Sequence, residues 1–532
     1  MKPQMTIENR KSKIENLSAA WLLVTAAVCG AVVMAVELLG ARLLGVGYGG
    51  SLTVWAAMIA VTLVSLAVGY FVGGWLSDRF PDPRLLYGGL LVSALLVAAC
   101  PHTRFILKAC HDALGLRRGA LASSALIFSL PLALLGTVSP FIIRLLCQEG
   151  RGIGVRAGGV YGVSTLGSVA GTLLTGLWLI PEFGTAAGFR ITAAAAAATG
   201  ALGLLGGWRG RQWHKGAAAL AVPLAIACAP GVAERVGQTY TAPDGERVEI
   251  KAIRDSAHGH IAILDKGRYR LLVVNGIVQT GLPRNFAALA KGQCLGNNYF
   301  QELLPYTVDD PRQSSALLVG LAGGMTAALL KLYGMDVDCV DLDPEIIGMA
   351  REFFGFTGSA VAADGRQFME SCRRRYDFCI VDTYSGDVFP FHLATQEAFQ
   401  AAKSVLKPGG VLALNYIGAP GGRAFACLYV TLQQVFPNVL AIGGEPGTDV
   451  QTITLFASDR KIEFNKGWLE FMGTSTGVDP VSAAIARLTV KPGQTAGFVL
   501  TDNYNPIDFL RAEEALRWRK RTEQNIGEQG IF

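Results

Sequence analysis

The chain has few of the residues that bind metal ions or pair a nucleophile with a histidine base. Its 532 residues include only six histidines and ten cysteines. No two cysteines are spaced as CxxC, and no histidine forms a motif with a serine or cysteine nucleophile. Zinc sites and Ser-His or Cys-His hydrolases depend on such groupings. The sequence therefore predicts neither a metal centre nor a hydrolase.

Charge is also scarce. Charged residues make up 17% of the chain and hydrophobic residues 51%, with a formal net charge of +6. Much of the positive charge lies in short loops between apolar runs, and no basic stripe with interleaved aromatic residues occurs. Nucleic-acid binding needs such a stripe, so we expect no nucleic-acid partner. The length allows two or three domains.

The hydrophobic residues gather before residue 231. Six of the seven apolar runs are long enough to cross a hydrocarbon core of ~30 Å, and the seventh is short for it. The first is too long for a signal-peptide core, so we expect it to be retained. Within the fifth, Gly167-x-x-x-Gly171 permits close helix packing. The runs are residues 17–45, 54–76, 85–100, 120–146, 160–180, 186–208 and 217–228.

Basic residues in the loops predict how these runs are oriented. Arg10, Lys11 and Lys13 precede the first run, and further basic residues follow the second, fourth and sixth. They belong on the cytoplasmic side if the N-terminus is inside, although the basic loop 101–119 argues the other way. Six spans leave the later domain in the cytoplasm, and seven place it outside. We expect a multi-pass inner (plasma) membrane protein whose later domain lies in the cytoplasm.

From residue 231 the composition becomes that of a soluble protein. Residues 247–253, 260–264 and 270–274 alternate as strands of a small antiparallel sheet do. Beyond residue 311, short apolar runs alternate with helical patterns, which predicts a parallel sheet of the α/β class. The expected divisions are an N-terminal segment (1–16), a helical bundle of six or seven spans (17–230), a small β-domain with an insertion (231–310), a Rossmann-like domain (311–510) and a charged C-terminal tail (511–532).

A glycine-rich loop follows the apolar run 316–319 and precedes a helical pattern. It contains Gly320, Gly323 and Gly324. Glycine lets the backbone turn sharply towards a ligand, and a helix N-terminus presents unpaired N–H groups to it. Asp341 follows the next strand, 21 residues after Gly320, the spacing of a ribose-binding acid in a nucleotide-binding βαβ unit. Other acidic residues at expected strand ends are Asp343, Asp364 and Asp382.

These residues resemble those of spermidine synthases, the aminopropyltransferases that share the methyltransferase version of this fold. The resemblance covers about residues 249–456. Residues 37–55 and 164–172 also resemble the membrane part of bacterial fused spermidine synthase-like proteins. The resemblance implies a multi-span α-helical membrane domain, then a small β-domain, then an α/β Rossmann-like methyltransferase-type domain. The implied reaction transfers an aminopropyl group from decarboxylated S-adenosylmethionine to an amine such as putrescine, without a metal.

The resemblance also implies which residues bind the cofactor. Asp341 matches the ribose-binding acid, and Asp364 with Gly365 matches the pair beside the adenine. Gln301, in Phe-Gln-Glu, matches a cofactor position. The glycine loop completes this part of the expected site with Gly320, Gly323 and Gly324.

Asp382 matches the aspartate that opens the family's Asp-x-x-Asp motif. A primary amine with a pKa of ~10.4 is mostly protonated at pH 7, so its nitrogen needs a proton acceptor before it can attack. We expect Asp382 to be that base, with Tyr384 shaping the pocket. Asp387, Glu302 and Asp502 are candidates to hold the distal ammonium of a diamine. Gln279 matches the last residue of the family's Asp-Gly-x-x-Gln turn and is expected at the substrate.

The chain departs from the family pattern at three positions. Gly323 stands where the family has an aspartate for the cofactor's amine. Ser385 stands at the second aspartate of Asp-x-x-Asp, although Asp387 lies two residues on. Glu249 stands where the family has a cofactor-contacting glutamine.

These departures leave three readings open. The first is a membrane-anchored aminopropyltransferase, and the second an S-adenosylmethionine-dependent methyltransferase on the same scaffold. The third is a non-catalytic domain that senses polyamines or nucleosides for a membrane transporter. We favour the decarboxylated cofactor because the residues expected near its tail are acidic, with no arginine or lysine among them. The expected partners are a small-molecule amine and the lipid bilayer, and a homodimer is allowed.

Overall fold

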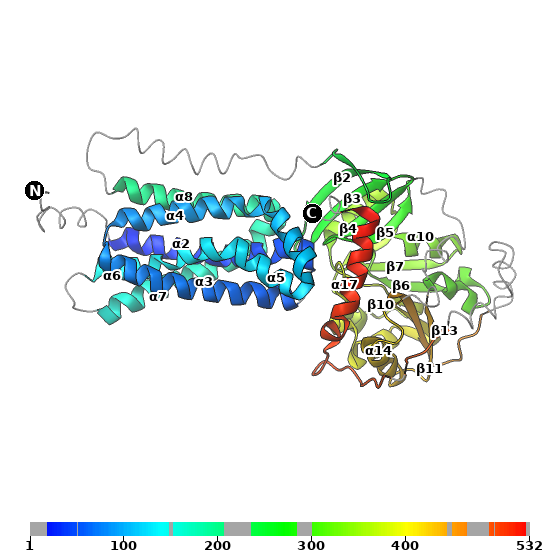
Figure 1. Ribbon diagram of the computed structural model, residues 1–532. Helices are drawn as coiled ribbons and strands as arrows, with labels where there is room; N and C mark the ends of the chain where they lie inside the picture. Colours follow the sequence, from blue (N-terminus) through cyan, green and yellow to red (C-terminus); the bar gives the residue numbers. More distant parts are fainter. Residues whose placement is uncertain are drawn as a thin grey trace, which may run out of the picture. The chain divides into compact units, whose positions relative to one another are not determined.

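The computed structural model describes residues 19–49, 52–147, 153–206, 236–284, 300–443, 449–464, 489–493 and 495–527 (Figure 1). The chain divides into two compact units. The first holds the long N-terminal helices together with residues 255–257, and the second holds residues 236–254 and the chain from residue 258 onward.

Long helices that lie side by side make up the first unit (Figure 1). A π-helical turn, η2 (Thr175–Leu179), joins the last two helices. Glycines in the left-handed region interrupt two of them, at Gly115 (φ 70°) and at Gly184 (φ 74°). The helices are α2 (Ala19–Tyr48), α3 (Leu52–Arg79), α4 (Pro83–Ala99), η1 (Cys100–His102), α5 (Arg104–Gly136), α6 (Val138–Leu146), α7 (Ile153–Leu174) and α8 (Ile180–Gly206).

Five segments of this unit are long and apolar enough to cross a membrane, by length and composition alone. They are Ala19–Tyr48, Val54–Arg79, Pro83–His102, Arg118–Leu146 and Ile153–Leu205. The last has 53 residues, and since ~20 residues suffice for one crossing, it has the length for two. The first six apolar runs of the sequence thus fall on helices. The seventh, residues 217–228, lies outside the described residues, so the expected six or seven spans stay a prediction.

Small residues bring α2 and α7 into close contact. A Cβ on Gly167 would lie 2.0 Å from the carbonyl oxygen of Ala27, and one on Gly171 would lie 2.5 Å from the Cα of Ala31. On the facing helix, a Cβ on Gly30 would meet the backbone of α7 in the same way. The close packing predicted for Gly167-x-x-x-Gly171 is therefore confirmed, and its partner is α2.

The second unit begins with a five-stranded sheet in which consecutive strands are neighbours. Asn275 (φ 48°) and Gly276 (φ 78°) form the two-residue turn between its last two strands, a sequence that favours a tight hairpin. The three strands predicted in this region are confirmed as β2, β3 and β4. The strands are β1 (Thr239–Thr241), β2 (Arg247–Asp255), β3 (His260–Lys266), β4 (Tyr269–Val274) and β5 (Ile277–Pro283).

An eight-stranded sheet forms the core of the α/β part, in the order β13-β11-β12-β10-β9-β6-β7-β8. The five strands from β10 to β8 in this order pair in parallel, and β11, β12 and β13 are antiparallel. The strands are β6 (Ser315–Val319), β7 (Asp336–Asp341), β8 (Ser359–Ala362), β9 (Tyr376–Val381), β10 (Leu406–Gly418), β11 (Asn438–Gly443), β12 (Gln451–Ser458) and β13 (Thr489–Val490).

The strand order reverses at β6. The chain runs from β6 outward to β7 and β8, then returns to the other side of β6 as β9. Such a reversal leaves a crevice at the carboxyl ends of the strands, where open α/β sheets bind ligands. Both faces of β6 are buried, since Leu317 and Val319 pack into one apolar cluster and Ala316 and Leu318 into another.

Helices cover the sheet, and the loops that join helices to strands border its carboxyl edge. The helices are η6 (Phe300–Thr307), η7 (Pro311–Gln313), α10 (Met325–Leu332), α11 (Pro344–Phe354), α12 (Gly365–Ser371), η8 (Phe391–Leu393), α13 (Gln396–Ser404), α14 (Arg423–Gln433) and α17 (Ile507–Ile526).

The C-terminal segment differs from the expectation of a charged tail at residues 511–532. As far as residue 526 it belongs to the 20-residue helix α17, which is drawn in red in Figure 1. Arg511, Glu514 and Arg519 are buried there. Their charges are met by residues far away in the sequence, which composition alone does not reveal. Residues 528–532 lie outside the described part.

Candidate active site

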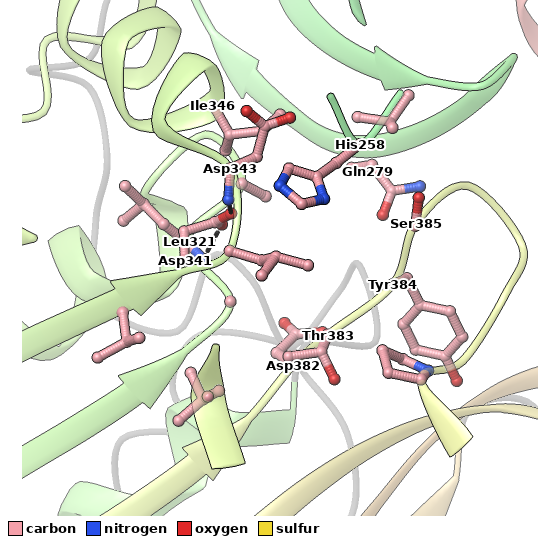
Figure 2. Close-up of a pocket in the computed structure, with 18 of the residues that line it drawn as sticks. His258, Gln279, Leu321, Asp341, Asp343, Ile346, Asp382, Thr383, Tyr384 and Ser385 are labelled. Carbon is pink, nitrogen blue, oxygen red and sulfur yellow. Dashed lines mark hydrogen bonds between the residues drawn. The ribbon is translucent and has the colours of Figure 1, made fainter. Parts of the chain in front are cut away.

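A pocket opens where the carboxyl ends of β6, β7 and β9 meet the five-stranded sheet (Figure 2). Residues that the sequence analysis selected line it on both sides. From the α/β part these are Gly320, Asp341, Asp343, Asp364, Gly365, Asp382, Tyr384 and Ser385, and from β5 it is Gln279.

Gly320 ends β6 in a conformation that other residues rarely adopt, with φ at 95°. A Cβ at this position would lie only 2.0 Å from the carbonyl oxygen of Asp382. The loop after β6 therefore passes directly against the end of β9, and glycine is required for this approach. Gly324 (φ 79°) then caps the N-terminus of α10.

Asp341 ties the glycine loop to the end of β7. Its Oδ2 accepts a hydrogen bond from the Leu321 amide at 2.8 Å, and its Oδ1 accepts one from the Asp343 amide at 2.9 Å. Burial raises the pKa of Asp341, and hydrogen bonds from the Asp343, Leu321 and Ala322 amides oppose the rise. A carboxylate has about four acceptor positions, so Asp341 keeps acceptor capacity for a hydroxyl group of a ligand in the pocket.

Asp364 and Gly365 begin α12 at the pocket wall. Asp364 caps this helix by accepting hydrogen bonds from the Arg366 and Gln367 amides, each at 3.0 Å. Its Oδ2 lies 2.9 Å from Nε2 of His392. Burial works to raise the pKa of Asp364, but the Gln367 amide and the His392 ring outweigh it and leave the pKa below its usual range.

Asp382 lies deep in the pocket, at the end of β9. Asn415 donates from Nδ2 to its Oδ1 at 2.7 Å, and Gln301 donates from Nε2 to its Oδ2 at 3.4 Å. Burial raises the pKa of Asp382, and the Asn415 hydrogen bond opposes the rise. Gln301 is 1% exposed and does not line the pocket itself. Gln301 therefore contacts Asp382 without lining the pocket.

Tyr384 and Gln279 form the wall beyond Asp382. The Tyr384 hydroxyl accepts a hydrogen bond from the Ile417 amide at 2.7 Å, and burial raises its pKa to about 12 against the opposing charge of Arg511. Gln279 donates from Nε2 to the carbonyl oxygen of Gly386 at 3.0 Å. This contact connects β5 to the loop that follows Asp382.

Two carboxylates predicted to hold an amine do not line the pocket. Glu302 is buried and accepts a hydrogen bond from the Tyr333 hydroxyl at 3.0 Å. Asp387 is also buried and pairs with Arg519, whose Nη2 lies 2.9 Å from its Oδ1. Both carboxylates thus serve contacts within the protein.

Two further acidic residues from the sequence analysis are paired with basic side chains. They are Glu249, at the position of the family's glutamine, and Asp502, a candidate to hold the distal ammonium. Oε1 of Glu249 lies 2.6 Å from Nζ of Lys251. Asp502 receives both terminal nitrogens of Arg366, each at 2.6 Å. Neither acid lines the pocket.

Gly323 and Gly324 belong to the glycine loop but not to the pocket wall. The Gly323 amide donates to Oγ1 of Thr280 at 3.3 Å, and a Cβ on Gly323 would lie 3.0 Å from Cγ2 of Thr280. Thr280 therefore fills the space where a longer side chain at position 323 would begin.

Sequence reasoning missed Asn415, Thr280 and two histidines. His258, between β2 and β3, and His392, in η8, both line the pocket, and Figure 2 shows the His258 ring facing the cavity. Neither belongs to a motif, so no pattern in the sequence pointed to them. Asn415 carried a weak signal, because it is a polar residue within the apolar strand β10.

Parts of the chain are similar to known proteins. Residues 258–416 match the family described as the spermine/spermidine synthase domain. A probable polyamine aminopropyl transferase of Bifidobacterium longum is 29% identical over 240 residues, covering 41% of this chain and 54% of that protein. A polyamine aminopropyltransferase of Nitrosomonas europaea is 34% identical over 202 residues, covering 35% and 59%.

A methyltransferase is also similar. The N-terminal histidine N-methyltransferase of Emericella nidulans is 28% identical over 156 residues, covering 27% of this chain and 28% of that protein. These alignments therefore span between 28% and 59% of the relatives' own lengths. Among solved structures, a probable spermidine synthase from Corynebacterium glutamicum has 20% identity and a TM-score of 0.35, covering 52% of this chain and 94% of that one.

Proposed function

We propose that this chain, which contains a spermidine synthase-like domain over residues 258–416, transfers an aminopropyl group from decarboxylated S-adenosylmethionine to an amine such as putrescine. The observation that carries the proposal is the Asp382 carboxylate. It lies deep in a pocket at the switch point of the sheet and is oriented by Asn415 and Gln301. A fixed carboxylate at this place suits the activation of an amine.

The other end of the pocket suits a nucleoside. Asp341 has acceptor capacity for ribose hydroxyls, and Asp364 with Gly365 borders the space for the base. Gly320 leaves the backbone open to a ligand because it has no side chain. Decarboxylated S-adenosylmethionine supplies a sulfonium, which is a good leaving group. The protein then needs to contribute position and a proton acceptor.

The acceptor nitrogen attacks the aminopropyl carbon next to the sulfonium. A new C–N bond forms as the C–S bond breaks, and the electron pair stays on sulfur to give methylthioadenosine. The nitrogen loses its proton to Asp382, directly or through water. Burial raises the pKa of Asp382, which brings it closer to the operating pH and makes it a better base than an exposed aspartate.

The test uses the purified full chain with decarboxylated S-adenosylmethionine and putrescine. We expect methylthioadenosine and spermidine in equal amounts, measured by mass spectrometry. The Asp382→Asn protein, prepared in the same way, is expected to give neither above background. Absence of methylthioadenosine from the wild-type protein with putrescine and with a monoamine such as n-butylamine would contradict the proposed function.

Methyl transfer from intact S-adenosylmethionine is the second candidate. The observation that favours it is Gly323, which Thr280 packs against, because no acid stands there for the ammonium of a decarboxylated tail. The two reactions leave different products. Methyl transfer gives S-adenosylhomocysteine, and aminopropyl transfer gives methylthioadenosine. Incubation with each cofactor and a mixture of amines therefore separates them.

We also propose that helices α2 to α8 anchor the domain to the inner membrane, with the catalytic part in the cytoplasm. The five apolar segments and the basic loops support this arrangement. Fusions of two reporters after Phe532, one active in the cytoplasm and one active in the periplasm, test the side. Activity of the periplasmic reporter alone would contradict the proposal.

A further inference from the structure

Asp382 is the acidic residue at the amine end of the described pocket wall. In Figure 2, the neutral side chains of Gln279, Ser385 and Tyr384 lie on one side of the view and Asp341 and Asp343 on the other, with Asp382 below them. All six residues line the pocket, and Asp343 begins α11, where its Oδ1 accepts a hydrogen bond from the Glu345 amide at 3.0 Å. Beyond Asp382, the described wall on this side has no second acidic residue.

Other acidic residues near the amine end bind partners within the protein. Asp387, two positions after Ser385, pairs with Arg519 at 2.9 Å, and Glu302 accepts a hydrogen bond from the Tyr333 hydroxyl at 3.0 Å. Neither carboxylate lines the pocket. Moving either one to a ligand would strand a buried partner, which is unfavourable.

Two positions that could carry an acid are neutral. Ser385 lines the pocket, and its Oγ lies 3.4 Å from Nδ2 of Asn275. At Gly323, the methyl group of Thr280 stands 3.0 Å from where a Cβ would lie.

We propose that the acceptor is a monoamine: a primary amine whose nitrogen approaches Asp382 and whose remainder is uncharged. This inference rests on the proposed aminopropyl transfer. The cofactor already brings a sulfonium and an ammonium to the amine end, where the described wall holds one carboxylate, that of Asp382. A diamine would add a second ammonium among Gln279, Tyr384 and Ser385, and burying a charge without a counter-charge is costly. The uncharged hydrocarbon part of a monoamine can be buried there without this free-energy cost.

Two further carboxylates, those of Glu514 and Asp508, lie on α17 outside the pocket wall. Glu514 accepts hydrogen bonds from the Tyr416 hydroxyl at 2.9 Å and the Ala419 amide at 3.2 Å, and the positive charge of Arg511 acts on Asp508. Since Asp508 does not line the pocket, it is not expected to contact an acceptor. It therefore serves as an acidic control position.

The first experiment compares n-butylamine with putrescine, which has the same carbon chain and one more amine. The full chain is incubated with decarboxylated S-adenosylmethionine and each amine, and methylthioadenosine formation gives kcat/KM. We expect kcat/KM for n-butylamine to equal or exceed that for putrescine. A tenfold or greater preference for putrescine would overturn the inference and leave aminopropyl transfer intact. No methylthioadenosine with either amine would instead overturn the proposed function and the inference with it.

The second experiment tests whether an added carboxylate changes the preference between putrescine and n-butylamine. Ser385→Asp places a carboxylate on the amine side of the pocket, and we expect it to shift the putrescine to n-butylamine ratio of kcat/KM at least tenfold towards putrescine. Ser385→Asn, of the same size without the charge, is expected to leave the ratio within threefold of wild type. Asp508→Asn should also leave it unchanged. A selective loss of putrescine turnover in Asp508→Asn would show that a distal ammonium binds there and would overturn the inference.

Discussion

Arg519 on α17 donates a hydrogen bond to Asp387 at 2.9 Å inside the protein. The Arg519 side chain is 0% exposed and that of Asp387 is 6% exposed. Its guanidinium also donates to the carbonyl oxygen of Asn275 at 3.1 Å. Asp387 belongs to the loop that follows Asp382, and Asn275 to the turn before β5, which carries Gln279. One buried arginine thus holds the two segments that border the amine end of the pocket.

The first prediction is that Arg519→Met strongly destabilises the protein. The substitution leaves Asp387 buried without its counter-charge, and breaking such a pair typically costs ~3–5 kcal/mol. The loss should appear as a lower unfolding midpoint of the full chain in detergent, monitored by circular dichroism.

Two further variants make this test specific. Lys520→Met removes an exposed charge from the next position of the same helix, so its midpoint should match wild type. Adding Asp387→Leu to Arg519→Met removes the stranded charge and should recover part of the loss. If Arg519→Met were as stable as Lys520→Met, the pair would have no structural role.

The second prediction separates catalysis from cofactor binding. Asp382→Asn should lower kcat by about 10²–10⁴-fold, the usual range for loss of a general base, while the Kd for the cofactor stays within a few-fold of wild type. Asp341→Ala should weaken cofactor binding, because it removes the ribose acceptor and the support that the Leu321 amide receives. Initial rates and calorimetric titration of the two variants measure these effects. Turnover at the wild-type level in Asp382→Asn would mean that another group accepts the proton.

The sequence predicts local features of the α/β part well. The run that ends at Gly320, the strand that ends at Asp341 and the helix that follows the glycine loop all form where expected, because strand periodicity, glycine and helix patterns are properties of neighbouring residues. The parallel sheet then brings Gly320, Asp341 and Asp382 to one edge. The grouping of these three residues therefore follows from topology.

Contacts between segments far apart in the sequence cannot be predicted from local patterns. Arg519 and Asp387 are 132 residues apart, and a charged segment that meets buried partners looks the same in sequence as an exposed tail. Glu302 and Asp387 were selected because they are acidic and close to a motif, yet each faces a partner inside the protein. His258 and Thr280 reach the pocket from the five-stranded sheet, whose position no single motif encodes.

The third prediction concerns the contact between α2 and α7. Gly167→Leu should push the helices apart, since even a Cβ would lie 2.0 Å from the carbonyl oxygen of Ala27. Overpacking of this kind costs ~1–3 kcal/mol or more. Gly162→Leu is the matched control on the same helix, because a Cβ there meets nothing within 4 Å. Thermal unfolding in detergent should show a lower midpoint for Gly167→Leu alone. Equal midpoints would mean that the two helices do not pack through Gly167.

The fourth prediction is that Asp382→Asn is more stable than wild type at neutral pH. Burial raises the pKa of Asp382 in the folded protein, whereas an unfolded aspartate titrates near ~3.9. Between these two values the folded state binds more protons, so the wild-type free energy of unfolding falls as pH rises through the folded pKa. Asparagine does not titrate. Its amide can also be accommodated, because Oε1 of Gln301 has no hydrogen-bond partner within the described residues.

The measurement is the difference in melting temperature between Asp382→Asn and wild type, taken in steps from about pH 4 to pH 8. All other titrating groups are shared by the two proteins, so the difference reports Asp382. We expect the variant's advantage to be smallest at pH 4 and to grow as Asp382 ionises. An advantage that shrinks with rising pH would mean that the folded pKa is depressed. The carboxylate would then be stabilised by its hydrogen bonds more than it is penalised by burial, and it would be a poor proton acceptor for an amine.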